Sequence, residues 1–320
     1  MHSHRDSMPA APGDVRVVVV GGANTDLVGV PDGELLAHDS NPGHVRTGAG
    51  GVGRNIAENL ARLGVRTHLI TAFGSDVASS ELAASCRLAG VDVSGSLVAE
   101  DLPGARYLAI VDGARDLAVA VNDMRVLDLL TPEAFGVAAR VELLAAASLV
   151  VVDANLPDST LVWLAANVSA PLVLDAVSAA KAPRAAAIVP RLAAVKASAL
   201  EAGVLLDRVV DGLADARSAA EELVARGAGV AFVTCGPAGS AWADTGGSGT
   251  VSAPLVTVAS TNGAGDAFAA GVAYALLAGV EAGGAARFGR AMASIALEDE
   301  ETVSPTVTFE AATARMKELG

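Results

Sequence analysis

Short β-branched runs alternate regularly with amphipathic segments over most of this 320-residue chain. The run Val15–Val20 opens the series, and strand-like and helix-like segments follow one another from Pro132 to Thr234. Repeated β-then-α units predict a mostly parallel, doubly wound sheet with helices on both faces. An uninterrupted apolar strand is typical of such a sheet, because both of its faces are covered. We therefore expect an α/β fold that binds ligands at the carboxyl ends of its strands.

Composition excludes several classes of protein. Apolar residues make up 52% of the chain and charged residues 18%, which suits a large buried core and excludes disorder. Aromatic residues are only 3%, so we expect helices that pack closely through small side chains. The net charge of −14 argues against a nucleic-acid partner.

The two cysteines, Cys86 and Cys235, lie too far apart to suggest a disulfide framework or a metal site. No apolar run reaches membrane-spanning length, so we expect a cytoplasmic protein without a membrane partner. Residues 1–13 are polar and predict a flexible tail, followed by one domain over residues 14–320.

Two segments interrupt the alternating pattern, at about residues 27–47 and 104–122. Within the second, Arg106–Val111 and Asp116–Val121 resemble a hairpin that turns at Asp112-Gly113. We interpret both segments as a small β-sheet lid over one end of the main sheet. Exposed strand edges favour pairing with a second copy, so a homodimer through the lid is our expectation.

A glycine-rich turn, Ser260–Phe268, comes between an expected strand at Leu255–Ala259 and an expected helix of small residues. The backbone N–H groups of Gly263, Ala264 and Gly265 would be unpaired there and form a seat for a phosphate. Asp266 places a carboxylate beside this seat, an arrangement that suits phosphoryl transfer to a hydroxyl. On local evidence alone, a structural turn explains the same string.

A second glycine cluster, Gly48–Asn55, also precedes an amphipathic helix-like run. Gly50 and Gly51 allow a ligand to approach the backbone closely, and we expect that ligand to carry sugar hydroxyls. Asn55 lies in the first turns of the helix, where its amide can face the same cavity. This cluster is not a dinucleotide fingerprint, because it does not follow the first strand and no acidic residue is suitably placed.

Polar side chains at strand ends complete the candidate site. Asn24 and Asp26 share a face in an extended segment, Asn122 ends the expected hairpin, and Asn155 follows a strand. Solvated turns explain these positions about equally well when each is considered alone.

The two glycine motifs, Gly50–Asn55 and Gly263–Asp266, together with the lid, resemble the ribokinase-like (PfkB) carbohydrate kinase family. The resemblance covers residues 15 to 303. Within that family, the stretches Asp39–Gly43 and Asn122–Met124 are most similar to the pseudouridine kinases. The resemblance implies a phosphotransferase that uses ATP and Mg²⁺ to phosphorylate the ribose 5′-hydroxyl of pseudouridine. Many relatives also use a monovalent cation such as K⁺ beside the second glycine turn.

The resemblance also implies roles for individual residues. Asp266 would accept the proton of the attacking hydroxyl, while the backbone of Gly263, Ala264 and Gly265 holds the phosphoryl group. The helix dipole would keep Asp266 ionised as a weak base. Substrate-binding positions would be Asn24, Asp26, Ser40, Asn41, Gly50, Gly51, Asn55, Asn122 and Asn155. The nucleotide would contact Lys196, Ser198, Thr234, Gly236, Gly239 and Asn262, with Glu201 ordering magnesium through water.

Two positions depart from the family pattern. Ser198 replaces a usual asparagine in the segment Lys196–Glu201, and Asn262 replaces a usual threonine before the glycine turn. Asn262 is still able to cap the following helix, but a phosphate contact that depends on a hydroxyl would be lost. Three hypotheses therefore stand: a pseudouridine kinase, a kinase for another nucleoside or ribose, and a weakened protein of the same fold that only binds a nucleoside.

Overall fold

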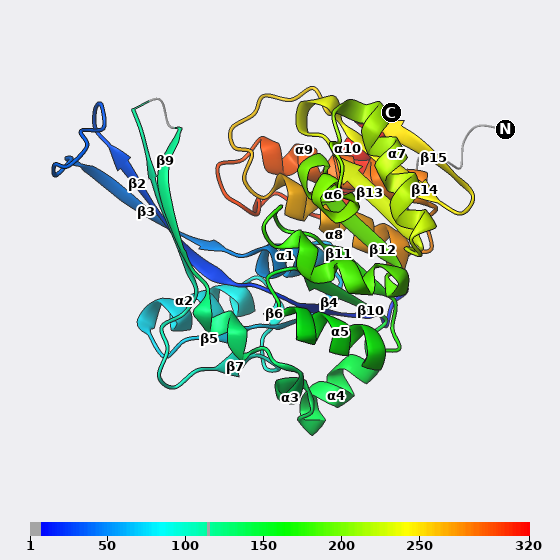
Figure 1. The fold of residues 1–320 in the computed structure, drawn as a ribbon, viewed down its shortest axis with the longest axis horizontal. Coiled ribbons are helices and arrows are strands. Elements are labelled where there is room, and N and C mark those ends of the chain that lie inside the picture. Colours follow the sequence, from blue (N-terminus) through cyan, green and yellow to red (C-terminus); the bar gives the residue numbers. More distant parts are fainter. Residues whose placement is uncertain (1–7, 114–115) are drawn as a thin grey trace.

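The computed structural model describes residues 8–113 and 116–320. Its centre is a nine-stranded sheet that is parallel from β6 to β13 and antiparallel in its last two strands (Figure 1). In spatial order the strands are β15 (Gly247–Val251), β14 (Ser240–Asp244), β13 (Val230–Thr234), β12 (Ala194–Ser198), β11 (Leu172–Asp175), β10 (Leu149–Asp153), β1 (Arg16–Val20), β4 (Arg66–Ile70) and β6 (Val91–Asp92). The expected α/β class is confirmed.

Successive valines of β1 face opposite cores, as the two-residue period of a strand requires. Val17 and Val19 belong to one hydrophobic cluster, and Val18 and Val20 to the other. Helices α1 (Val52–Arg62), α2 (Val77–Leu88), α8 (Ala264–Leu277), α9 (Ala282–Leu297) and α10 (Phe309–Leu319) cover the first face.

The second face is covered by η1 (Arg125–Leu129), α3 (Pro132–Phe135), α4 (Ala138–Ala145), α5 (Asp158–Asn167), η2 (Ala182–Arg191), α6 (Ala199–Leu206) and α7 (Gly212–Ala225). Small residues allow close helix packing, as the composition predicted. A Cβ atom on Gly271 of α8 would lie 2.9 Å from the Cα of Gly289 in α9.

A separate four-stranded sheet forms the lid and projects from one end of the main body (Figure 1). Its order is β3 (Gly43–Gly50), β2 (Asn24–Pro31), β8 (Arg106–Val111) and β9 (Leu117–Asp123). The lid contains the two segments that interrupt the alternating pattern in the sequence. A short pair, β5 (Ala72–Phe73) and β7 (Leu97–Val98), lies near its base.

Two expected strands are wrong. No strand forms at 255–259; instead, the backbone N–H groups of Ala259 and Ser260 donate to the carbonyl of Leu297. Leu255 is 98% exposed, so this apolar run has no sheet edge to join and no core to enter. The sequence also favours one continuous strand over Val91–Val98, but the structure divides this segment into β6 and β7, which pair with different neighbours.

The expected flexible tail falls partly outside the described residues, since the structure begins at residue 8. Met8 is buried in the core, and the N–H of Ala11 donates to the hydroxyl of Tyr274 at 2.9 Å. Residues 8–13 are therefore attached to the domain. No helix in the described part of the chain is long and apolar enough to cross a membrane.

Candidate functional site

The start of helix α8 has the open backbone geometry that the sequence predicted for a phosphate seat. Gly263 occupies the cap position with φ of 79°, and no side chain hydrogen-bonds this helix end. Asn262 is exposed one residue earlier, so it does not cap the helix. A left-handed glycine caps the helix because a Cβ atom there would lie 1.8 Å from the carbonyl oxygen of Thr302. The uncapped N–H groups remain available to an anion.

Asp266 lies half-buried in the first turn of α8, beside this seat. Its Oδ2 accepts a hydrogen bond of 2.7 Å from Nδ2 of Asn55 in α1, which joins the two glycine motifs. Burial and then the carboxylate of Asp175 raise the pKa of Asp266 to about 7. The expectation that the helix dipole keeps this group fully ionised at neutral pH is therefore wrong, because burial outweighs the dipole.

Lys196 supplies the positive charge of the site. Its Nζ lies 3.0 Å from Oδ2 of Asp175, and a Cβ atom on Gly265 would lie only 3.1 Å from it. Burial alone would lower the pKa of Lys196, but surrounding carboxylates, Asp175 first, raise it. The lysine is therefore charged and faces the phosphate seat.

A strained turn fixes Asp175, the last residue of β11. Val177 has φ of 65°, and the N–H of Ser178 donates to the carbonyl of Ala176 at 2.7 Å, forming a tight γ-turn. The N–H of Val177 also donates to Oδ1 of Asp175 at 2.8 Å. Such a conformation costs a β-branched residue about 1–3 kcal/mol. It leaves the other oxygen of Asp175 facing Lys196.

The first glycine motif forms the wall of the site opposite the start of α8. Gly51 has φ of 100°, and a Cβ atom on it would lie 2.5 Å from the backbone of Ala23. A Cβ atom on Gly50 would lie 2.3 Å from Oδ2 of Asp26. Asp26 accepts a hydrogen bond of 2.5 Å from Asn24, and burial raises the pKa of this carboxyl group. The structure thus brings Asn24, Asp26 and Gly50 together.

Asn155 follows β10 at the same edge of the sheet. Its Oδ1 accepts from Lys181, and a Cβ atom on Gly22 would lie 2.9 Å from its Nδ2. The neighbouring Asp153 is fully buried and accepts from the N–H of Gly22 at 2.8 Å. The sequence did not indicate Lys181 as a site residue, because it precedes a 3₁₀ helix and does not follow a strand.

The inner face of the lid adds Asn122 and one residue that the sequence did not indicate. Backbone pairing aligns Gly48, Asp26, Tyr107 and Asn122 in one row across the four strands. Paired residues project to the same side of a sheet, so Tyr107 and Asn122 share the face of Asp26. Only the strand register could have identified Tyr107.

Ser40 and Asn41 do not join this group. They lie beyond Pro31, which is about 17 Å along the strand from Asp26. The amide of Asn41 closes its own loop, since it accepts from the N–H of Leu36 at 2.7 Å and donates to the carbonyl of Leu36. In a single chain, Ser40 and Asn41 therefore lie at the far end of the lid.

Ser198 and Glu201 form a capping box at the start of α6. The N–H of Glu201 donates to Ser198 Oγ at 3.3 Å, and the N–H of Ser198 donates to Glu201 Oε2 at 2.7 Å. No group of three metal-binding side chains occurs among the described residues. Magnesium often needs only one or two carboxylates besides substrate phosphates. Glu201 fits a contact through water, because its carboxylate has further lone pairs.

Thr234, Gly236 and Gly239 lie at the turn between β13 and β14, next to Ser198 in the sheet. Gly239 has φ of 113°, and a Cβ atom on it would lie 2.2 Å from the carbonyl of Val251. The N–H of Gly239 donates to the carbonyl of Gly236 at 3.0 Å. Gly239 therefore has a structural reason of its own at this turn.

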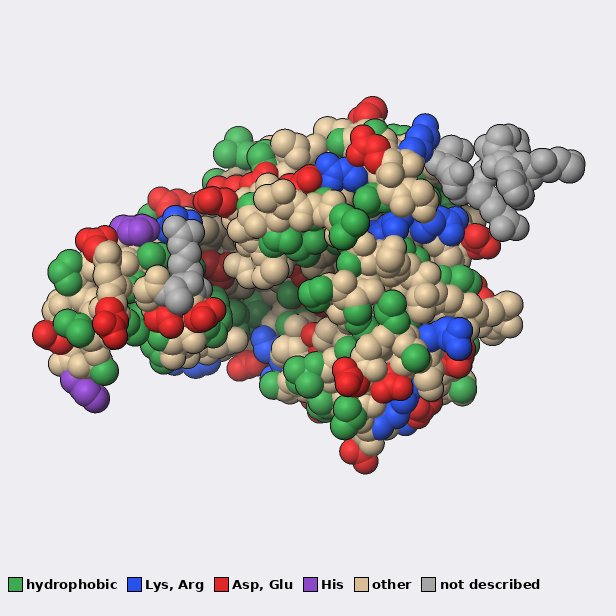
Figure 2. Space-filling view, turned by 90° about the horizontal axis from the view of Figure 1, so that it is seen from above, with side chains coloured by type: hydrophobic (Ala, Val, Ile, Leu, Met, Phe, Trp, Pro, Cys, Tyr) green, Lys and Arg blue, Asp and Glu red, His purple; other side chains and the backbone are tan. Residues whose placement is uncertain are grey.

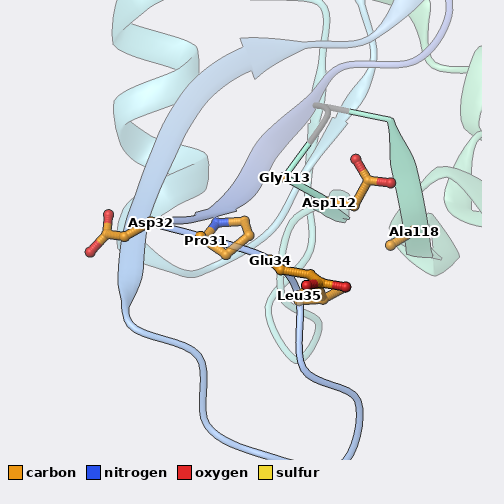
Figure 3. A pocket seen from close by; sticks show the side chains of 8 residues that line it. Pro31, Asp32, Glu34, Leu35, Asp112, Gly113 and Ala118 are labelled. Atoms are coloured by element: carbon orange, nitrogen blue, oxygen red, sulfur yellow. The ribbon is translucent and has the colours of Figure 1, made fainter.

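The surface is hollowed between the lid and the body (Figure 2). A different cavity, of about 770 Å³, lies at the tip of the lid (Figure 3). Its lining includes Pro31, Asp32, Glu34 and Asp112, and none of the predicted site residues. This cavity is therefore separate from the residues around Asp266.

A model of the pfkB family of carbohydrate kinases matches residues 14–308. The chain belongs to this family. A pfkB carbohydrate kinase is a phosphotransferase with an alcohol group as acceptor, and kinases of this ribokinase-like fold use ATP and Mg²⁺. The family and the enzyme class predicted from the sequence are confirmed.

Individual relatives match this chain over most of its length. The pseudouridine kinase of Escherichia coli K12 is 33% identical over 297 residues, covering 92% of this chain and 94% of the relative. The guanosine-inosine kinase of Exiguobacterium acetylicum is 26% identical, covering 79% and 84%. A carbohydrate kinase from Agrobacterium tumefaciens has a TM-score of 0.85 at 30% identity, covering 95% and 97%. Arabidopsis thaliana ribokinase complexed with ribose and ATP, 21% identical with a TM-score of 0.84 and covering 97% and 99%, shows the shared fold.

Proposed function

We propose that this kinase transfers the γ-phosphoryl group of ATP to the ribose 5′-hydroxyl of pseudouridine. The similarity to the pseudouridine kinase of Escherichia coli over 92% of the chain supports this substrate. The polar row on the inner face of the lid, with Asp26, Tyr107 and Asn122, offers groups for both a ribose and a base.

The hydrogen bond between Asn55 and Asp266 carries this proposal. It places a residue of the sugar-side motif against a residue of the phosphate-side motif. A pKa of about 7 suits Asp266 as the proton acceptor for the attacking hydroxyl, because a general base works best near the operating pH. Asp26 and Asn24 would hold ribose hydroxyls on the other side.

The backbone of Gly263, Ala264 and Gly265 would hold the transferred phosphoryl group. Lys196 would balance its charge, since its Nζ faces Gly265. Phosphoryl transfer depends mainly on alignment and charge stabilisation. Magnesium, when bound through Glu201 and water, would neutralise the nucleotide phosphates. The lid would exclude water that competes for the phosphoryl group.

Another purine or pyrimidine nucleoside is the second candidate substrate. The similarity to a guanosine-inosine kinase, over 79% of the chain, favours it. Both alternatives use the same chemistry at Asp266. A protein that only binds a nucleoside is the third hypothesis, motivated by Ser198 and Asn262.

Release of ADP, measured in parallel with pseudouridine, uridine, guanosine, adenosine and ribose, tests this proposal. We expect turnover with pseudouridine that exceeds turnover with every other acceptor. A higher kcat/KM for guanosine or ribose would overturn the substrate. Calorimetric binding of pseudouridine without any ADP release would favour the binding protein.

The outer face of the lid supports a homodimer. The rows Leu27–Leu108–Val121 and Ile110–Val119 project opposite to Asp26, and Val119 and Val121 are 55% and 59% exposed. We propose that a second copy covers this apolar face. Sedimentation at micromolar concentration should give twice the monomer mass, and Val121→Asp should give the monomer.

We also propose a monovalent cation beside the second glycine turn. The turn at 260–263 packs against the end of α9 and the loop beyond it, through Leu297 and Thr302. The resemblance to the family implies a cation beside this turn. Activity should rise when KCl replaces LiCl at equal ionic strength, and equal rates in both salts would refute this site.

A further inference from the structure

Arg54 belongs to the first glycine motif but has no role in the proposal above. It is only 6% exposed, in the first turn of α1. Its Nη1 donates to the carbonyl of Ala49 at 2.9 Å and to Oδ1 of Asn55 at 2.8 Å. Its Nη2 pairs with the carboxylate of Glu58, which Arg62 also holds at 2.8 Å.

The amide of Asn55 is held at both ends. Arg54 holds its oxygen, and Asp266 accepts from its nitrogen at 2.7 Å. An arginine can only donate hydrogen bonds, and an ionised carboxylate can only accept them. The two orientations of an asparagine amide have almost the same shape, so hydrogen bonds decide between them. Only one orientation satisfies both neighbours.

Without Arg54, the oxygen of Asn55 would lose its donor inside the protein, where Asn55 is 3% exposed. The amide could then rotate by half a turn and present its oxygen to Asp266. That orientation stabilises a protonated Asp266, which can donate, and repels the ionised form. Arg54 therefore favours the state of Asp266 that can accept a proton.

We propose that Arg54 is a positioning residue that locks the Asn55 amide, so that its N–H₂ group always faces the Asp266 carboxylate. This inference rests on the proposed role of Asp266 as the proton acceptor. Arg54 itself touches no reacting atom. It acts through Asn55, and Glu58 fixes the guanidinium from behind.

Other titratable groups lie around Arg54, Asn55 and Asp266. Asp175, Lys196 and Asp153 act on Asp266, and Glu58, Asp26 and Cys86 lie near Arg54. Among the described residues, none of these groups forms a hydrogen bond with the amide of Asn55. A change that is specific to Arg54 should therefore reach Asp266 through Asn55.

The test variant is Arg54→Met, and its matched control is Arg62→Met. Arg62 also pairs with Glu58, but it contacts neither Asn55 nor Asp266. We expect the acid limb of kcat/KM against pH to move up by about one unit in Arg54→Met. Arg54→Lys, which keeps a charge near Glu58 without the guanidinium fork, should fold like the wild type and shift the limb in the same direction. Arg62→Met should keep the limb of the wild type.

Carbon-13 NMR of aspartate-labelled protein reads the Asp266 carboxyl directly, with Asp266→Asn identifying its signal. We expect its titration midpoint to rise in both Arg54 variants and not in Arg62→Met. Unchanged midpoints in both Arg54 variants, or an equal rise in Arg62→Met, would overturn the positioning role. If the midpoints rise but Asp266→Asn keeps full turnover, Asp266 is not the proton acceptor, and the positioning of the Asn55 amide by Arg54 stands.

Discussion

Two glycine-rich turns start helices on the same face of the sheet, yet they differ in what their backbones contact. At α1 the turn is filled by the protein itself: the N–H of Arg54 donates to the carbonyl of Gly22 at 3.0 Å, and Gly53 to Asn55 are buried. At α8, Gly263 to Asp266 remain half-buried and uncapped. The same sequence signal thus yields one helix start that packs against the protein, at α1, and one that is open to a ligand, at α8.

The largest expected effect separates chemistry from packing. Asp266→Asn should lower kcat about 10²–10⁴-fold, because the amide cannot accept the hydroxyl proton. ADP release gives the rate, and calorimetry should find nucleoside binding retained. Asn55→Ala, which removes the α1 side chain that donates to Asp266, should cost less. An active Asp266→Asn would remove this residue from the mechanism.

Matched glycine substitutions sharpen the comparison. Gly265→Ala should lower kcat/KM for ATP about 10²-fold, since a methyl group would enter the phosphate seat beside Lys196. Thermal unfolding should change little, because only a flexible lysine must move.

Gly53→Ala should behave in the opposite way. Its Cβ atom would lie 2.9 Å from the backbone of Gly21, so overpacking should cost about 1–3 kcal/mol of stability. The melting temperature should fall by several degrees. A stable Gly53→Ala, or an unstable Gly265→Ala, would break the distinction between the two turns.

The pH profile tests the electrostatics of the open turn. With a pKa of about 7, Asp266 becomes protonated as the pH falls, so kcat/KM should drop about tenfold per unit below pH 7. Lys196 lowers this pKa, and Lys196→Met should therefore move the limb to higher pH. A limb near pH 4 in the wild type would contradict the effect of burial.

The smallest expected effect concerns the start of α6, a third helix start, which is capped by the side chain of Ser198. Ser198→Asn restores the residue usual in the family, and asparagine caps helices about as well as serine. We expect a stability change within about 0.5 kcal/mol and ADP release within about twofold of the wild type. A large gain in activity would show that Ser198 weakens the nucleotide side.

Much of the fold followed from local pattern. Valine runs with a two-residue period and helices of small residues were sufficient to predict the parallel sheet and its close helix packing. The strand predicted at Leu255–Ala259 is wrong, because β propensity is realised only beside a partner strand. Leu255 is exposed and has no such partner. Turn formers and spacing located both glycine motifs.

The sequence by itself determined the family, the class of reaction and the residues at strand and helix ends, because these depend on local chemistry. Only the tertiary structure decided which of them meet: Asn55 and Asp266 are 211 positions apart and share a hydrogen bond. The structure also set the charge state of Asp266, since burial and the nearby carboxylate of Asp175 are properties of neighbours in space. Hydrogen bonds and Coulomb interactions act over a few ångströms, and folding alone brings distant segments that close.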